Sequence, residues 1–186
     1  DDPRRRLLVQ ALAAGFFADS LVARQAMAQV LGTSPSKLPP GRSIYRVSGD
    51  VKVDGKPATV ETKVGGRSTL ETGRNSEVVY AVGESAFILR GESRVILETA
   101  QADSSVLSGL RLLSGKLLSV FAAKRPMQLK AATATIGIRG TGVYMEADPE
   151  QTYFCTCYGV ANIASTTDPQ SEETVAAQHH DRPLYI

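Results

Sequence analysis

The sequence predicts an all-β protein, either a sandwich of two packed sheets or a short β-roll of the solenoid type. Glycine is frequent, with 16 residues among 186, and tryptophan is absent. Val, Ile, Thr and Ser recur in runs of about five residues, which is near the usual strand length. Turn-forming residues separate these runs, and no helical period follows residue 41. Because the runs leave no room for helical crossovers, hairpins or tight solenoid turns must join the strands.

The first 28 residues are expected to be an export signal that is cleaved. Three arginines at residues 4–6 precede the apolar run 7–17. This run has the length of a secretory core and is too short to span a bilayer. Ala26 and Ala28 suit the narrow pocket of signal peptidase, so cleavage is expected before Gln29.

The export route and the fate of this segment have alternatives. The paired arginines loosely fit the twin-arginine route, beside the Sec route. Residues 5–31 could instead remain as an amphipathic helix, because Leu8, Ala11, Leu12 and Phe16 share one face at helical spacing. An uncleaved helix of this kind would dock the protein to a larger envelope assembly.

The remainder is expected to be a periplasmic protein that does not span the membrane once it is cleaved. Residues 29–41 are a proline-rich linker, since the prolines can neither continue a helix nor sit inside a sheet. No cysteine for a lipid anchor lies near the cleavage site. The net charge is +2 for the chain and, with 17 basic and 16 acidic residues after residue 28, +1 for the remainder. A nucleic-acid partner is therefore not expected.

Residues 42–164 are expected to form the all-β domain, and residues 165–186 a C-terminal segment. The alternation of apolar runs and turn residues predicts the strands. They are expected at Ile44–Ser48, Val51–Asp54, Ala58–Val64, Glu77–Val82, Ala86–Arg90, Arg94–Glu98, Leu110–Leu113, Lys116–Phe121, Gln128–Ala131, Thr141–Glu146, Thr152–Tyr158, Val160–Ala164 and Thr174–Ala177.

The most specific motif is the glycine-rich segment 133–144, Thr-Ala-Thr-Ile-Gly-Ile-Arg-Gly-Thr-Gly-Val-Tyr. Gly137, Gly140 and Gly142 allow the backbone to turn and to approach its neighbours closely. Arg139 can satisfy several carbonyls or one carboxylate with its planar fork. A fold-holding role is expected for Arg139 and Thr141, with a ligand-facing role as the alternative.

This segment resembles the signature of the FecR domain family, in which an Arg-Gly-Thr triplet precedes a strand. Similar elements occur in the same order at residues 49–53, 72–76 and 115–120, so the resemblance covers about residues 42–164. The family implies an extracytoplasmic recognition, scaffold or signal-sensing module with a protein partner in the cell envelope. The cytoplasmic anti-sigma segment of the family's regulators is not recognised in this sequence, so direct control of a sigma factor is not expected.

The cysteines and histidines form two short clusters. Cys155 and Cys157 are two residues apart, so a strand would point both sulfurs to one face. With His179 and His180 they make a candidate site for zinc or copper. A strained disulfide between the two cysteines and packing as two free thiols are the alternatives. A redox role is a further option, although no Cys-x-x-Cys motif is present.

No motif of catalysis has recognisable spacing, so the protein is not expected to be an enzyme. The sequence lacks the Gly-x-Ser-x-Gly, His-Glu-x-x-His and phosphate-loop patterns. The favoured hypothesis is a periplasmic binding, scaffold or signal-sensing module. A metal-binding or redox-sensing envelope protein is the alternative.

Overall fold

The computed structural model describes residues 38, 41–100, 106–121, 125–168, 170–179 and 182–186. These residues form thirteen strands and no helix, which confirms the all-β prediction. The predicted export signal and most of the linker lie outside the described residues. The strands are β1 (Ile44–Ser48), β2 (Val51–Val53), β3 (Lys56–Pro57), β4 (Thr69–Thr72), β5 (Glu77–Val82), β6 (Ser85–Leu89), β7 (Ser93–Thr99), β8 (Leu107–Val120), β9 (Pro126–Lys130), β10 (Ala134–Ala147), β11 (Thr152–Ser165), β12 (Glu172–Ala177) and β13 (Pro183–Tyr185).

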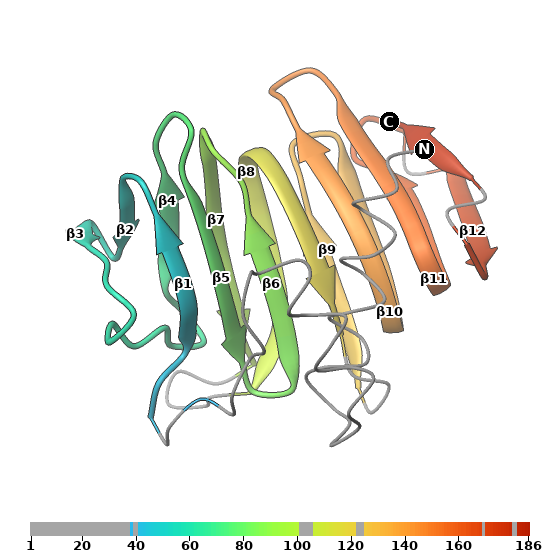
Figure 1. Cartoon of the computed structure of the whole chain (residues 1–186). Helices are drawn as coiled ribbons and strands as arrows, with labels where there is room; N and C mark the ends of the chain where they lie inside the picture. Colours follow the sequence, from blue (N-terminus) through green and yellow to red (C-terminus); the bar gives the residue numbers. More distant parts are fainter. Residues whose placement is uncertain (1–37, 39–40, 101–105, 122–124, 169, 180–181) are drawn as a thin grey trace.

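All thirteen strands belong to one sheet, which bends into two layers that face each other. The first layer has the order β1-β5-β6-β8-β10-β11-β13, and the second has the order β3-β2-β4-β7-β8-β9-β10-β11-β12. Strands β8, β10 and β11 run through both layers, and Figure 1 shows the chain progressing from β1 at one side to β12 at the other. The pairing is antiparallel except between β8 and β9.

The long strands bend at glycines. Gly115 in β8, Gly140 in β10 and Gly159 in β11 have φ angles of 85°, 63° and 92°. Glycine adopts this left-handed conformation without the steric cost that a Cβ would bring. Each of these glycines separates the half of its strand that lies in the first layer from the half in the second.

The main core lies between the two layers. Its largest fully buried members include Tyr80, Phe87 and Phe154. The rings of Tyr80 and Phe87 are stacked with centroids 4.9 Å apart, and Phe121 meets Phe87 edge-on at 5.6 Å. Such ring pairs stabilise a core by more than the burial of their apolar area alone. These rings therefore stabilise the place where β5, β6 and β8 meet.

The observed strands differ in several places from those that the sequence predicts, since β3, β4 and β13 have no counterpart among the expected strands and one expected strand is absent. The expected strand Ala58–Val64 is wrong, because residues 59–62 form a local turn in which Thr62 donates its N–H to the Thr59 carbonyl at 3.0 Å. The Thr59 N–H also bonds the Thr62 hydroxyl at 2.9 Å, a side-chain contact that competes with strand pairing. Past residue 164, β12 and β13 add to β11, so the C-terminal segment continues the sheet.

The structure contains no candidate for a membrane-crossing helix within the residues that it describes.

Candidate functional site

The first layer carries a second apolar cluster on the side that faces away from the main core. We call this cluster the outer apolar face; it consists of Val79, Ala86, Ile88, Leu118, Val120, Tyr144, Cys155 and Cys157. Three tyrosines, Tyr45, Tyr153 and Tyr158, pack against it. The face extends over β5, β6, β8, β10 and β11, which are neighbours in the first layer.

The two layers differ in how their strands are buried. All five residues of β6 are buried, whereas β9 and the first part of β7 alternate between buried and more exposed residues. Alternation is typical of a sheet with one face in water, and continuous burial is typical of a sheet covered on both faces. The first layer is therefore built to be covered on its outer side, and none of the described strands lies over that side.

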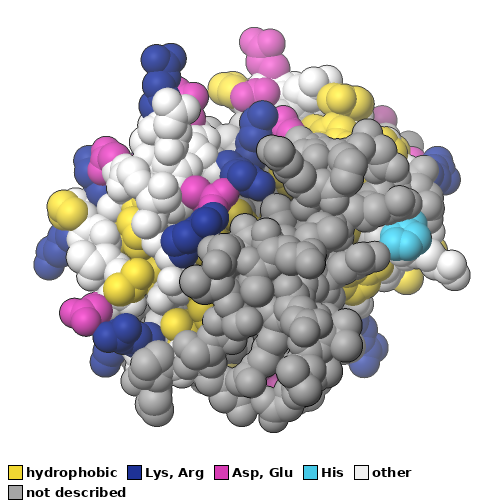
Figure 2. Space-filling model, viewed as in Figure 1, with side chains coloured by type: hydrophobic (Ala, Val, Ile, Leu, Met, Phe, Trp, Pro, Cys, Tyr) yellow, Lys and Arg dark blue, Asp and Glu magenta, His cyan; other side chains and the backbone are white. Residues whose placement is uncertain are grey.

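Charged side chains follow one border of the outer apolar face. Glu77 pairs with Arg46 and, at 2.8 Å, with Arg90. Further along the same border, Lys116 lies 3.5 Å from Glu146. These ion pairs are partly exposed and add little to stability. They give the apolar face a polar rim, the arrangement found in protein–protein interfaces. In the view of Figure 2, acidic and basic side chains are interspersed rather than gathered by sign.

The predicted signature lies at the opposite end of this face, where β10 bends. The Thr141 side chain is fully buried and its hydroxyl donates to the Val160 carbonyl at 3.1 Å. A Cβ at Gly142 would lie 2.4 Å from the Tyr158 ring, so the ring occupies the space that only glycine leaves free. The Arg139 side chain is exposed, and in the described part of the chain it takes part in no ion pair or side-chain hydrogen bond. The signature thus shapes the corner through Gly140, Thr141 and Gly142.

Gly137 differs from the other glycines of the signature. A Cβ at Gly137 would meet its nearest neighbour, the Asn162 carbonyl oxygen, at 4.0 Å, which is an ordinary contact. Close approach of the backbone therefore does not require glycine at this position.

The phenol of Tyr158 is held in its neutral form. Burial, and to a smaller extent the nearby Cys157, raises the pKa of Tyr158 to about 12. The ring is only partly buried, and it connects the Gly142 corner with the cysteine side of the outer apolar face.

Both cysteines lie on the outer apolar face, as their spacing predicts. Cys155 and Cys157 are buried and are not joined by a disulfide, and the Cys157 sulfur lies 3.9 Å from the Cys155 carbonyl oxygen. The disulfide alternative is therefore not formed in this structure. Both cysteine side chains pack among the apolar side chains of this face.

The described residues do not bring the predicted metal ligands together. His179 is exposed between β12 and β13, and His180 lies outside the described residues. Within the described ranges, no group of three or more His, Cys, Asp or Glu side chains could hold a metal ion. Cys155, Cys157 and His179 therefore do not converge, and a zinc or copper site that includes His180 stays a prediction.

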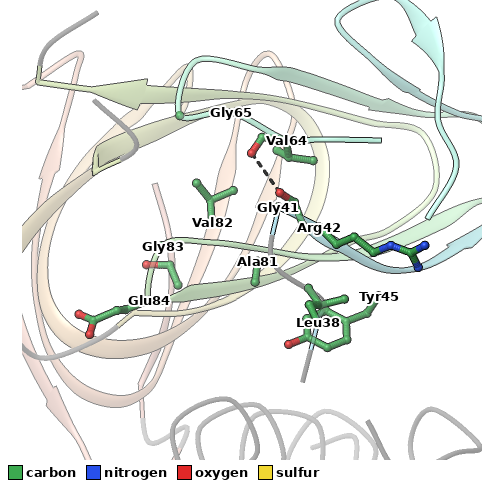
Figure 3. A pocket seen from close by; sticks show the side chains of 13 residues that line it. Leu38, Gly41, Arg42, Tyr45, Val64, Gly65, Ala81, Val82, Gly83 and Glu84 are labelled. Atoms are coloured by element: carbon green, nitrogen blue, oxygen red, sulfur yellow. Dashed lines mark hydrogen bonds between the residues drawn. The ribbon is translucent and has the colours of Figure 1, made fainter. Parts of the chain in front are cut away.

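A cleft that sequence reasoning missed lies beside the outer apolar face, near the start of β1. Its volume is about 520 Å³, and its lining includes Leu38, Tyr45, Ala81 and Glu84 (Figure 3). The hydroxyl of Ser43, the residue before β1, donates to the Val64 carbonyl at 3.3 Å. This bond connects the start of β1 with the loop that lines the other side of the cleft. Because Tyr45 also packs against the outer apolar face, the cleft continues that face.

The fold resembles that of a solved bacterial protein. Two crystal structures of a candidate anti-sigma factor from Parabacteroides distasonis, at 1.65 and 2.50 Å resolution, each match with a TM-score of 0.50 and 9% sequence identity. Each alignment covers 63% of this chain and 58% of the other. No family model and no curated protein matches the sequence.

These comparisons show a shared fold alone, because the sequence identity is far below the level at which function carries over. The chain spans little more than half the length of the solved structures that it matches. Membership of the FecR domain family stays a prediction from the signature at residues 133–144.

Proposed function

We propose that this chain is a non-enzymatic, protein-binding regulatory module that acts in the bacterial cell envelope. The observation that carries the proposal is the outer apolar face, because this apolar cluster is separate from the main core. The signature resemblance and the fold shared with a candidate anti-sigma factor support a role in signalling. The sequence features of residues 1–28 support export.

The partner that fits the outer apolar face is an amphipathic helix of another protein. The face is built from aliphatic and aromatic side chains on five neighbouring strands and has charged residues along its border. A helix lays its apolar stripe on such a surface, and its polar side can meet a charged rim. Small ligands instead need enclosed pockets with convergent polar groups.

The buried polar groups also favour binding over catalysis. In the described part of the chain, every buried polar residue other than tyrosine and cysteine is a serine or a threonine. General acid–base chemistry relies on His, Asp, Glu, Lys, Tyr or Cys groups placed in a cleft. Burial raises the pKa values of Tyr45 and Tyr158, which keeps these two phenols protonated.

Photo-crosslinking in the native host tests the proposal. A benzoylphenylalanine replaces Leu118 of the outer apolar face, and a matched control replaces Arg111, which is exposed on the same strand in the second layer. We expect a defined intermolecular adduct from position 118 alone. The purified partner should then bind the chain, and Ile88→Glu should weaken its affinity about tenfold or more. Equal adducts from both positions, or unchanged affinity of the Ile88 variant, would contradict the proposal.

A further inference from the structure

We propose that two copies of this chain pair through β12 and form a symmetric dimer, in which the second layer continues from one copy into the other. The contact is antiparallel, uses backbone hydrogen bonds, and places Thr174 of each copy on the two-fold axis. It uses a different surface from the outer apolar face, so the inference goes beyond the proposed function and does not depend on it.

β12 is an edge strand of the second layer. It pairs with β11 on one side, and no described segment pairs with its other side (Figure 1). An edge of this kind presents unpaired backbone N–H and C=O groups, which can pair with a strand of another chain. β12 is six residues long and contains no proline. The strand can therefore accept a partner strand along its length.

One hydrogen bond beside β12 shows which of its backbone groups point outward. The Ser165 N–H donates to the Ser171 carbonyl at 3.1 Å, and the register between β11 and β12 has no bulge. Because the bonding direction alternates along an antiparallel strand, every second residue from Ser171 onward faces β11. The N–H and C=O groups of Glu172, Thr174 and Ala176 therefore point to the free edge.

Charge and hydrogen bonding select one register for two such edges. Pairing centred on Thr174 opposes all three outward residues of each copy and places Glu172 opposite Ala176 of the second copy. Glu173 then faces Val175. A centre at Glu173 or at Glu172 would set the same carboxylate of the two copies against each other, and like charges directly opposite destabilise a sheet. A centre at Val175 opposes only two of the three outward residues within the strand.

The edge at β12 differs from two other edges of the sheet. β3 is two residues long and contains Pro57, and β13 is three residues long and begins with Pro183. Short length and proline both prevent strands from pairing at an edge. An inward-facing charge has the same effect, but Glu173 of β12 is only partly buried and forms an ion pair with Arg182 at 2.5 Å. Its charge is therefore already compensated within the chain.

The chemistry of the edge fits a second copy better than a peptide of another protein. Peptides that add to a sheet edge gain specificity from side-chain pockets beside it. The cleft of this molecule lies beside β1, on the opposite side of the sheet from β12 (Figure 1). In the two-fold arrangement Thr174 meets Thr174, a cross-strand pair that stabilises antiparallel sheets.

The proposed contact closes on itself, so assembly ends at the dimer. Pairing of one short strand buries less surface than a standard interface, so the dimer should form reversibly and depend on protein concentration. Each dimer carries two outer apolar faces. A partner with two binding segments would therefore bind the dimer more tightly than the monomer.

Disulfide crosslinking of the full chain, residues 1–186, tests the register. In a background with Cys155→Ala and Cys157→Ala, an added cysteine is the only thiol. Thr174→Cys places two cysteines in a hydrogen-bonded pair with Cα atoms about 5.5 Å apart, within disulfide reach. The matched control Asn162→Cys lies opposite Thr174 on β11, and its copies would be three strand spacings apart, about 14 Å. Mild oxidation should give at least about tenfold more covalent dimer from position 174 than from position 162.

Sedimentation equilibrium of the full chain tests the backbone contact. Ala176→Pro removes an outward N–H and leaves the bonds to β11 in place, so the dissociation constant of the dimer should rise about tenfold or more. The control Ala176→Val keeps this N–H and should dimerise like wild type. Near-UV circular dichroism verifies that both variants are folded. Equal covalent dimer from positions 174 and 162, a wild-type chain that stays monomeric at all concentrations, or an open series of larger oligomers would overturn the inference.

Discussion

Two buried threonines differ in whether their hydroxyl has a partner. Thr141 and Thr156 are both fully buried, but only the Thr141 hydroxyl forms a hydrogen bond, to the Val160 carbonyl. Thr156→Val should raise the free energy of unfolding by about 1 kcal/mol, because it removes an unsatisfied buried hydroxyl. Thr141→Val should lower it by about 1–2 kcal/mol. Urea denaturation of both variants checks the pair, and the same sign of change in both would refute this account.

Two glycines with similar φ angles differ in the space around them. Gly115 has a φ of 85° and a Cβ there would lie 2.1 Å from the Ser93 hydroxyl and 2.6 Å from its Cα. Gly55 has a φ of 76° and nothing within 4 Å. Gly55→Ala should cost about 1–2 kcal/mol, the strain of a left-handed backbone. Gly115→Ala should cost clearly more, since the corner must also shift. Equal midpoints in thermal unfolding would contradict the close packing of this corner.

The raised pKa of Tyr158 predicts a loss of stability at high pH. Since its folded-state pKa is about 12 and its ordinary value is 10.0, the folded state favours the neutral phenol. This contribution is fully present below pH 10 and is lost as the pH rises through 12. Tyr158→Phe cannot ionise, so its unfolding free energy should fall less steeply between these values. Urea midpoints as a function of pH test this, and identical slopes for the two proteins would show that Tyr158 does not contribute.

At the scale of elements, most strands can be predicted from the sequence, but the residues at which neighbouring strands end cannot. Runs such as Ile44–Ser48 and Glu77–Val82 match β1 and β5 in full. The glycines Gly115 and Gly159 were interpreted as breaks between strands, whereas the chain only bends there and continues in the other layer. Local residue preferences indicate a turn-prone position, but the pairing partners on each side decide whether the strand ends.

The outer apolar face could have been found from the same runs. Residues 85–89 read as a nearly continuous apolar stretch, which indicates burial on both faces of a strand. The spacing of Cys155 and Cys157 correctly placed them on one face. Which residues of the other strands join them depends on register, and register follows from long-range pairing that the sequence does not specify.

Two isoleucines that both point away from the main core test whether the outer side of the first layer is more deeply buried than the outer side of the second. Ile88 of β6 lies on the outer side of the first layer and is 1% exposed, whereas Ile96 of β7 is only partly buried on the outer side of the second. In the full chain, Ile88→Ala should lower the unfolding free energy by about 2–4 kcal/mol, and Ile96→Ala by about 1 kcal/mol or less. Equal losses in chemical denaturation would mean that both outer sides are equally open to water.

At the scale of the whole molecule, the two layers cannot act as separate folding units. Strands β8, β10 and β11 are each 14 residues long, and each contributes one half to either layer. Melting of one layer would therefore leave broken strands and an exposed core in the other. A binding event on the outer apolar face should in turn stabilise both layers together, because a ligand of the folded state shifts the whole cooperative equilibrium.

This architecture predicts one cooperative unfolding transition. Far-UV circular dichroism follows strands in both layers, whereas the near-UV signal depends strongly on Tyr80, Tyr144 and Tyr153, which belong to the first layer. Urea denaturation followed by the two signals should give coincident curves, as expected for a two-state domain. Gly115→Ala, which strains the bend of β8, should move both curves by the same amount. A near-UV midpoint that falls below the far-UV midpoint would mean that the first layer unfolds on its own, and that the shared strands do not couple the layers.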